Sequence, residues 1–206
     1  DKWIISKTEN LTKKVTESFE KCQFNIAVED IRNFTWHVFC DYYLEAVKDR
    51  LYQPDIHGQE SRLAAQYTLY EVLYRIVQML APVIPHLTEE IYQYMFFEGK
   101  GYKSLQVSQW PKFNPVLVDE TAEKNGDLII AIMGEVRHDK AEKKMPLNAP
   151  IKNMTIYAGN AETAGIIKQG CIDIASTLKI ENITVLPEKG EGRQVAPYEV
   201  YIKTEY

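Results

Sequence analysis

The stretch Phe24–Arg50 has the sequence FNIAVEDIRNFTWHVFCDYYLEAVKDR and organises the rest of this 206-residue chain. It contains neither glycine nor proline, so it predicts one unbroken helix, roughly 40 Å long at about 1.5 Å per residue. Two apolar stripes run along it, one through Phe24, Ala27, Ile31, Phe34, Val38 and Tyr42, the other through Trp36, Phe39, Tyr43 and Val47. Together they are wider than the ~100° stripe of a surface helix, so we expect this helix to form the centre of a bundle.

Apolar residues at helical spacing predict further helices on both sides of the central one. These cover about residues 2–20, 63–81, a segment after Pro85 with Leu87, Ile91 and Met95 facing inward, and 119–144. Short connections between the first helices favour an antiparallel up-and-down arrangement.

The sequence pattern changes at Met145–Pro146, where strands replace the long helices. Apolar and β-branched runs predict strands over about 152–157, 180–186 and 198–204, with short helices over 161–168 and 171–177. The predicted fold class is therefore mainly α, a helical bundle over residues 1–147 followed by a small α+β subdomain over 148–206.

Composition restricts the classes of function. Hydrophobic residues make up 45% of the chain and charged residues 26%, as in ordinary globular proteins. The formal net charge of −5 argues against a surface that is basic throughout, so any contact with nucleic acid must use a local patch. Three widely spaced cysteines predict reduced thiols and no structural metal. Reduced thiols are the default in a cytosol, so we expect a cytoplasmic protein. No apolar run is long enough to cross a membrane, and the chain reads as part of a longer polypeptide.

Three motifs carry a resemblance to a known family. The run Phe34–Glu45 resembles the signature helix of the anticodon-binding domain shared by valyl-, isoleucyl- and leucyl-tRNA synthetases of class I. The segment Pro82–Ile91 is similar to the Pro-x-x-Pro-x-x-Thr-Glu-Glu-Ile segment of that domain. Arg137, Lys140 and the run Met145–Ile151 (MPLNAPI) resemble the valyl family. The absence of a late cysteine cluster favours the valyl over the isoleucyl enzymes, and the absence of a C-terminal heptad pattern favours the archaeal type.

The polar side of the central helix is the first candidate binding site. Asn33 and His37 lie one turn apart and offer hydrogen-bond donors and acceptors, and Arg32 at their edge can reach a phosphate. Proteins that read RNA take unpaired bases by stacking and by hydrogen bonds to base edges. The aromatic side chains of this helix, Trp36 among them, are assigned to the core, because aromatic residues at helical spacing are more often core than ligand platforms.

The second candidate site is the basic segment between residues 137 and 152. Five basic residues stand there against two acidic ones, and we name Arg137, Lys140, Lys143 and Lys144 as tRNA phosphate contacts. The competing interpretation is a solvated helix end, where lysine also suits the helix dipole.

No catalytic centre is predicted in this chain. The Lys143–Met145 run lacks the Ser-Lys-Ser of the family's catalytic loop, and no nucleotide-binding signature, catalytic triad or metal-ligand pattern is present. The resemblance implies a valine–tRNA ligase whose ATP and Mg²⁺ bind in a catalytic domain outside these residues, with tRNA and that domain as partners and a monomeric state. Two alternatives stay open: a fragment of an isoleucyl or leucyl enzyme, and a helical protein-interaction module without RNA binding.

Overall fold

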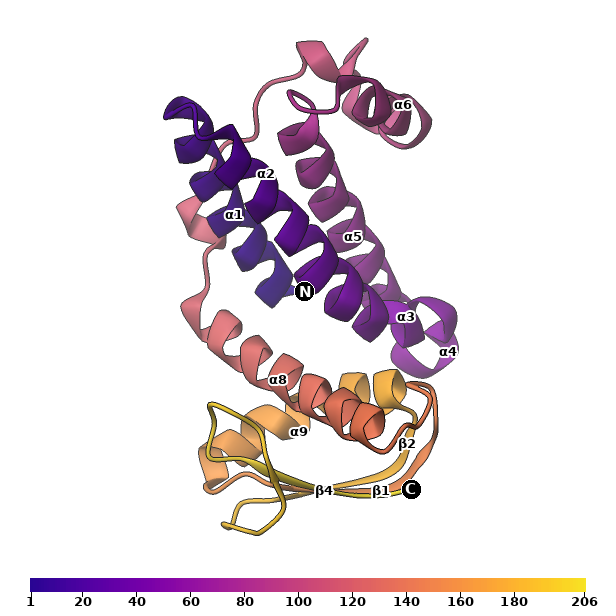
Figure 1. Ribbon diagram of the computed structural model, residues 1–206. Coiled ribbons are helices and arrows are strands. Elements are labelled where there is room, and N and C mark those ends of the chain that lie inside the picture. The colour runs from indigo at the N-terminus through magenta and orange to yellow at the C-terminus, as the bar shows by residue number, and fades with distance from the viewer. The chain divides into compact units, whose positions relative to one another are not determined.

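The computed structural model describes residues 1–206, which form two compact units (Figure 1). The first unit comprises residues 1–44 and 53–123, and the second comprises residues 45–52 and 124–206. Each unit takes residues from two separate parts of the chain, because the helical run after Phe24 passes from the first unit into the second at Glu45.

The first unit is a helical bundle. Its α-helices are α1 (Lys2–Glu20), α2 (Phe24–Phe34), α4 (Pro54–His57), α5 (Gln59–Leu80), α6 (Pro85–Met95) and α7 (Phe97–Lys100). Helix α1 packs against both α2 and α5, and α5 packs against α6. Two single 3₁₀ turns, η2 (Leu105–Val107) and η3 (Pro115–Leu117), interrupt the irregular segment that follows. The expected bundle is confirmed, with short connections between successive helices as the sequence predicts.

An aromatic cluster holds α5 and α6 together. Tyr74 on α5 contacts both Tyr92 and Phe96, with ring centroids 6.3 and 5.1 Å apart, and Tyr92 and Phe96 are fully buried. The Tyr92 hydroxyl donates a hydrogen bond of 2.9 Å to the backbone oxygen of Tyr102. Burying these large rings removes apolar surface from water, so the cluster stabilises the packing of α6 on α5.

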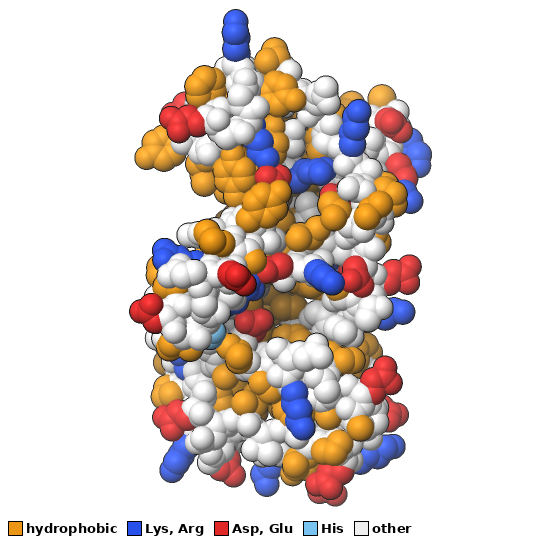
Figure 2. Space-filling view, turned by 180° about the vertical axis from the view of Figure 1, so that it is seen from behind, with side chains coloured by type: hydrophobic (Ala, Val, Ile, Leu, Met, Phe, Trp, Pro, Cys, Tyr) orange, Lys and Arg blue, Asp and Glu red, His pale blue; other side chains and the backbone are white.

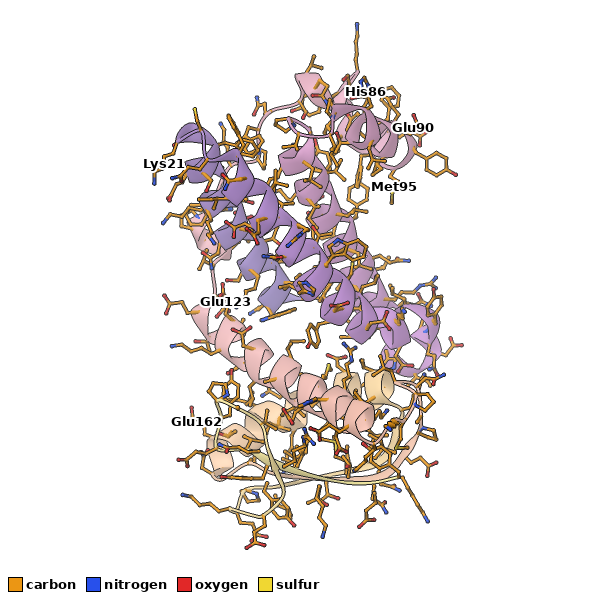
Figure 3. All side chains as sticks on the ribbon, viewed as in Figure 1. Lys21, His86, Glu90, Met95, Glu123 and Glu162 are labelled. Atoms are coloured by element: carbon orange, nitrogen blue, oxygen red, sulfur yellow. The ribbon has the colours of Figure 1, made fainter.

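Helix α6 presents a different face to the core from the one we expected. Leu87 and Met95 were predicted to face inward but are 58% and 51% exposed. Figure 3 labels Met95 on the outer side of α6. Thr88 and Tyr92 are buried in their place. The buried face of α6 differs from the predicted one because a tyrosine ring whose hydroxyl is hydrogen-bonded fits the core as well as a leucine does. The spacing of apolar residues cannot by itself distinguish these two possibilities.

The central segment is helical throughout, as predicted, but it is not one α-helix. Helix α2 ends at Phe34, residues Thr35–Leu44 form the π-helix η1, and α3 (Glu45–Tyr52) follows without an intervening turn. The buried residues record the change, since Ala27, Ile31 and Phe34 are followed by Phe39, a step of five residues. A π-helix bonds residue i to residue i+5, so it changes which side chains share a face.

This change of register overturns the placement of Trp36. We assigned its side chain to the core, yet it is 59% exposed, whereas Phe34 and Phe39 on either side are 7% and 6% exposed. A continuous 3.6-residue period predicts that Trp36 and Phe39 share a face. The π-helical turn separates them and directs the indole outward.

The second unit is a small α+β structure. It contains α3, α8 (Glu120–Glu142), which begins four residues before the unit does, α9 (Ala161–Leu178) and four strands. The strands are β1 (Ile151–Tyr157), β2 (Ile180–Leu186), β3 (Arg193–Gln194) and β4 (Tyr201–Glu205), in the sheet order β2-β1-β4-β3. Strands β1 and β2 are parallel with Ile151 opposite Ile180, and β4 pairs antiparallel to both β1 and β3. The parallel pair requires a crossover, which α9 provides.

Helix α9 is one element where the sequence predicted two. Gly170 does not break it, because the glycine allows close packing: a Cβ there would lie 2.7 Å from Cδ1 of Ile129 on α8. This contact also explains why α8 belongs to the second unit. The division at residues 123/124 therefore differs from the predicted boundary at 147/148, which followed the change from helix to strand and not the packing.

No helix of the structure is both long enough and apolar enough to cross a membrane.

Candidate nucleic-acid interface

The exposed side of α2 and η1 brings together the first set of predicted site residues. Arg32 is exposed, and its guanidinium lies 3.4 Å from Oδ1 of Asn33 and 3.8 Å from a carboxylate oxygen of Glu29. His37 Nδ1 lies 3.2 Å from Oδ2 of Asp41, with 71% of the histidine side chain exposed. These are long or solvent-exposed pairs, which contribute little to stability and can be exchanged for contacts with a ligand.

A shallow hollow lies along the same helix. It is lined by Phe24, Asn25, Val28, Glu29 and Arg32. Phe24 was expected in the core, but its ring is 54% exposed and contacts Phe19 with ring centroids 5.8 Å apart. The helix therefore offers both apolar and polar groups to solvent within its first three turns.

Lys140 was named as a phosphate contact, and the structure excludes that role. Its side chain is fully buried, and Nζ donates hydrogen bonds to the backbone oxygens of Leu147, Ala149 and Leu178 at 3.0, 2.7 and 2.9 Å. Burial, with a smaller effect from Arg137, lowers the pKa of this lysine. Its three donors are all used inside the protein, so none remains for RNA.

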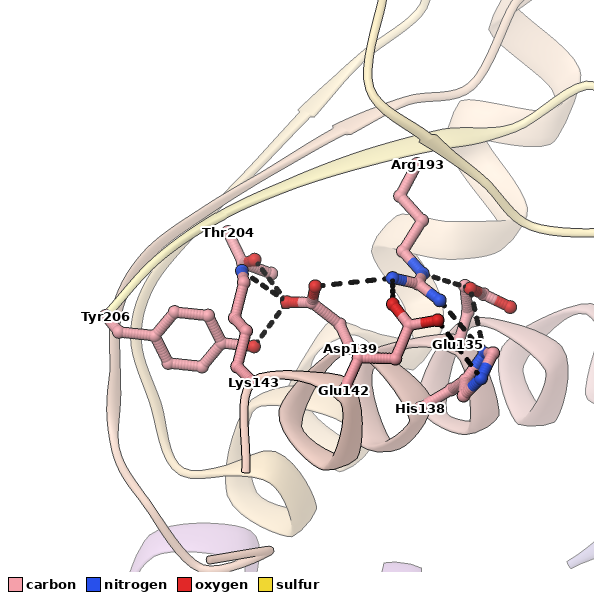
Figure 4. Close-up of polar contacts among 8 residues, drawn as sticks. All are labelled: Glu135, His138, Asp139, Glu142, Lys143, Arg193, Thr204 and Tyr206. Carbon is pink, nitrogen blue, oxygen red and sulfur yellow. Dashed lines mark hydrogen bonds and ion pairs between the residues drawn. The ribbon is translucent and has the colours of Figure 1, made fainter. Parts of the chain in front are cut away.

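Lys143 takes part in an internal network of charges (Figure 4). Its Nζ lies 2.8 Å from Oδ2 of Asp139 and 4.4 Å from the centroid of the Tyr206 ring. Asp139 also accepts hydrogen bonds from the hydroxyls of Thr204 at 2.9 Å and Tyr206 at 2.5 Å. Asp139 therefore ties the end of α8 to β4 through Thr204, and Lys143, whose side chain stays 46% exposed, pairs with both Asp139 and the Tyr206 ring.

Arg193 on β3 completes this network and was not found from the sequence. Its guanidinium pairs with Glu135, Asp139 and Glu142 on α8, the last at 2.6 Å, and lies 2.9 Å from Nδ1 of His138. The network thus joins three carboxylates to two cations, Lys143 and Arg193. The part of the basic segment that lies within it therefore carries no positive excess. A positional signal does exist, since Glu135, Asp139 and Glu142 share one face of α8.

The network shifts the pKa of several of its members. Burial raises the pKa of Asp139, but hydrogen bonds from Lys143, Tyr206 and Thr204 outweigh it and hold the pKa below its ordinary value. Burial and the hydrogen bond to Asp139 raise the pKa of Tyr206 to about 12. Hydrogen bonds to Glu142 and Glu135 raise the pKa of Arg193, so this cation stays charged throughout the accessible pH range.

Two basic residues of the predicted set remain at the surface or near it. Lys144 is exposed and has a positive φ of 55°, two residues after α8 ends. Arg137 is half-buried on α8. Both belong to the second unit, whereas Arg32, Asn33 and His37 belong to the first.

Comparison with known proteins gives this arrangement its context. Residues 1–155 match the family model described as the anticodon-binding domain of tRNA ligase. The chain belongs to this family. It is 46% identical over 191 residues to a valine–tRNA ligase from Methanothermobacter thermautotrophicus, which is 93% of the chain but 21% of that protein. It is 41% identical over 192 residues to the enzyme of Pyrococcus furiosus, again 93% of the chain and 21% of the relative.

More distant relatives bear the same name. A valine–tRNA ligase from Methanocaldococcus jannaschii is 35% identical over 189 residues, covering 92% of the chain and 20% of that protein. The chain therefore spans about a fifth of the length of the curated relatives it matches. The resemblance to the valyl family and its archaeal type is confirmed.

The anticodon-binding domain has no broad basic face on the side shown in Figure 2, where Lys and Arg side chains are scattered among Asp and Glu. This agrees with the net charge of −5.

No group of three or more His, Cys, Asp or Glu side chains lies close enough together to hold a metal ion. On α6, Glu89 accepts hydrogen bonds from the Ser104 hydroxyl at 2.8 Å and the Leu105 amide at 2.9 Å, so this acidic residue anchors the next segment.

Proposed function

We propose that this chain is the anticodon-recognition part of a valine–tRNA ligase and binds the anticodon loop of valine tRNA. One observation carries the proposal: a chain of the anticodon-binding family presents the exposed Arg32 and His37 with the half-buried Asn33 on α2 and η1. Amide and imidazole groups can bond to base edges, and a guanidinium can bond to a phosphate. The names of the relatives favour valine over isoleucine or leucine.

Lys144 contributes charge without reading sequence. A lysine is a point charge on a flexible stem, so it attracts any phosphate backbone. Arg137 adds to this contribution in the same unit. Lys140 has no part in it, and Lys143 has a smaller part than a free lysine because Asp139 already pairs with it.

The chemical step belongs to other parts of the parent enzyme. Joining valine to tRNA with ATP and Mg²⁺ requires a nucleotide-binding domain, and the signatures of one are missing from these residues. The parent's catalytic domain is thus the second partner of this chain, which we expect to act as a monomer in the cytoplasm. Valine-dependent exchange of pyrophosphate into ATP by the chain alone, above background, would contradict this assignment.

The binding test compares two RNA hairpins, one with the anticodon loop of valine tRNA and one with its middle anticodon base changed. Asn33→Ala should weaken the first hairpin more than the second, by about 1–3 kcal/mol if the discrimination measured for DNA bases applies. Gln66→Ala is the matched control, because Gln66 is an exposed amide on α5 of the same unit. Lys144→Ala should weaken both hairpins equally and reduce the salt slope by less than about one unit.

The outcomes separate the alternatives. If the chain binds neither hairpin more tightly than an unrelated RNA, the anticodon function is wrong, and the interaction-module interpretation becomes the better one. If Asn33→Ala and Gln66→Ala behave alike, RNA binding stands but Asn33 does not read a base.

A further inference from the structure

Trp36 is a large aromatic side chain that the fold does not use for packing. It is 59% exposed and has no hydrogen-bonding, ionic or ring partner within the chain. The other two tryptophans are half-buried, and the indole N–H of Trp110 donates a hydrogen bond of 2.8 Å to the Thr16 hydroxyl. A buried tryptophan normally finds such a partner for its N–H, so the lack of one marks Trp36 as a surface group.

The local structure holds Trp36 outward. It is the second residue of η1, between the buried Phe34 and Phe39. π-helical turns are rare and concentrate at functional sites, because they cost stability that a plain α-helix would keep. Here the π-helical turn places the Trp36 indole at the surface, where a continuous α-helix would direct it toward the core.

The neighbours of Trp36 match one kind of ligand. Arg32 lies four residues before it and Asn33 three residues before it, so both are within one helical turn. His37 follows it directly. An aromatic face beside a guanidinium, an amide and an imidazole is the combination with which proteins take an unpaired RNA base, by stacking on its plane and bonding to its edge.

We propose that Trp36 is a base-stacking residue of this domain, holding one unpaired base of the anticodon loop against its indole ring. Asn33 and His37 meet the edge of that base, and Arg32 meets the adjoining phosphate. The proposal rests on the anticodon function proposed above and names the residue that supplies its stacking contact. The positive charge of Arg32 favours an RNA occupant over an apolar protein surface.

Another exposed aromatic residue provides the contrast. Tyr94 on α6 is 91% exposed, but α6 contains no lysine or arginine and carries Glu89 and Glu90. Carboxylates also lie near Trp36, but there Glu29 and Asp41 are paired with Arg32 and His37, whereas α6 has no lysine or arginine to offer to a phosphate. Tyr94→Ala is therefore the matched control for Trp36→Ala.

The first experiment measures binding of the valine anticodon hairpin by the 206-residue chain. Trp36→Ala should weaken binding about 5- to 150-fold, the range found when a stacking residue is removed. Trp36→Phe should retain most of the affinity because a phenyl ring also stacks, and Tyr94→Ala should leave it unchanged. Thermal unfolding of all three variants should match the wild type, which separates loss of contact from loss of fold.

The second experiment tests stacking directly. Hairpins with the base removed at one loop position at a time are bound to the wild type and to Trp36→Ala. Removing a loop base and replacing Trp36 by alanine should each reduce the binding free energy. At one loop position these two reductions should not add, because the stacked base and the indole ring form a single interaction. The hairpin should also quench the tryptophan fluorescence of the wild type, and this quenching should disappear in Trp36→Phe.

The results distinguish failure of this inference from failure of the proposed function. If the hairpin binds but Trp36→Ala binds as tightly as Tyr94→Ala, Trp36 does not stack a base, although the anticodon function stands. Losses that add at every loop position, or quenching that persists in Trp36→Phe, overturn the stacking role as well. If no variant, wild type included, binds the hairpin, the proposed function itself is wrong.

Discussion

The ammonium nitrogen of Lys140 lies 2.9 Å from the backbone oxygen of Leu178, the last residue of α9, and donates a hydrogen bond to it. The last carbonyls of a helix carry partial negative charge, which compensates a buried cation. Two further carbonyls, of Leu147 and Ala149, complete the set. Lys140 therefore fixes the loop after α8 to the end of α9, and no carboxylate is needed to neutralise it.

Replacing Lys140 by methionine should destabilise the second unit by about 2–3 kcal/mol. The substitution keeps an apolar stem but leaves three buried carbonyls without donors, and hydrogen bonds to charged groups contribute about 1.5–3 kcal/mol. Urea unfolding measures the loss. Lys144→Met is the control, and should change stability by less than about 0.5 kcal/mol because Lys144 is exposed. Equal effects of the two substitutions would contradict the structural role of Lys140.

Arg193 should be important for stability although its charge lies at the surface of the unit. Arg193→Met removes the guanidinium partner of Glu135 and Glu142 and leaves Lys143 as the cation beside Asp139, so we expect a loss of roughly 1–3 kcal/mol. Lys189→Met is the matched control, since Lys189 and its partner Glu199 are about 80% exposed. The prediction is tested by hydrogen exchange at β3 and β4 amides, which should become faster in the first variant only.

The Asp139 network should make the second unit sensitive to acid. The pKa of Asp139 is lowered on folding, so its contribution is fully present above the unfolded value near pH 4 and is lost as the pH falls through the folded value. Asp139→Asn should remove this part of the acid dependence. A wild type and variant with identical slopes of unfolding free energy against pH would show that the network does not couple to folding.

The same network should respond to alkali in the opposite direction. The pKa of Tyr206 is raised to about 12, so its contribution is present below about pH 10 and is lost as the pH rises toward 12. Tyr206→Phe should be less stable than the wild type at neutral pH and should lose less on going to alkaline pH. Ultraviolet titration of the phenolate checks the pKa itself.

The two aromatic residues on either side of the π-helical turn should differ sharply when removed. Phe39→Ala should cost about 3–5 kcal/mol, because it empties a buried site. Trp36→Ala should cost less than about 1 kcal/mol, because the ring is mostly in water. Thermal and urea unfolding of the two variants, measured side by side, check the difference. A large loss of stability in Trp36→Ala would contradict the exposed position of this side chain and show that it packs in the core.

The sequence by itself determined the elements and the family. Helical spacing located α1, α5 and α8, apolar and β-branched runs located β1 and β2, and the Phe34–Glu45 and Pro82–Ile91 motifs indicated the anticodon-binding domain. These features are local: periodicity depends on residues a few positions apart, and a helix or strand forms wherever it can bury one face.

Only the tertiary structure decided which side chains are free to act. Lys140 and Lys144 look alike in the sequence, but one meets a carbonyl 38 residues away and the other stays in solvent. Asp139 meets Tyr206 across 67 residues, and Arg193 meets Glu142 across 51. Trp36 turned outward because η1 changed the helical period to let Phe39 reach the core. Burial and pairing depend on what packs against a residue, and spacing along the chain does not contain that information.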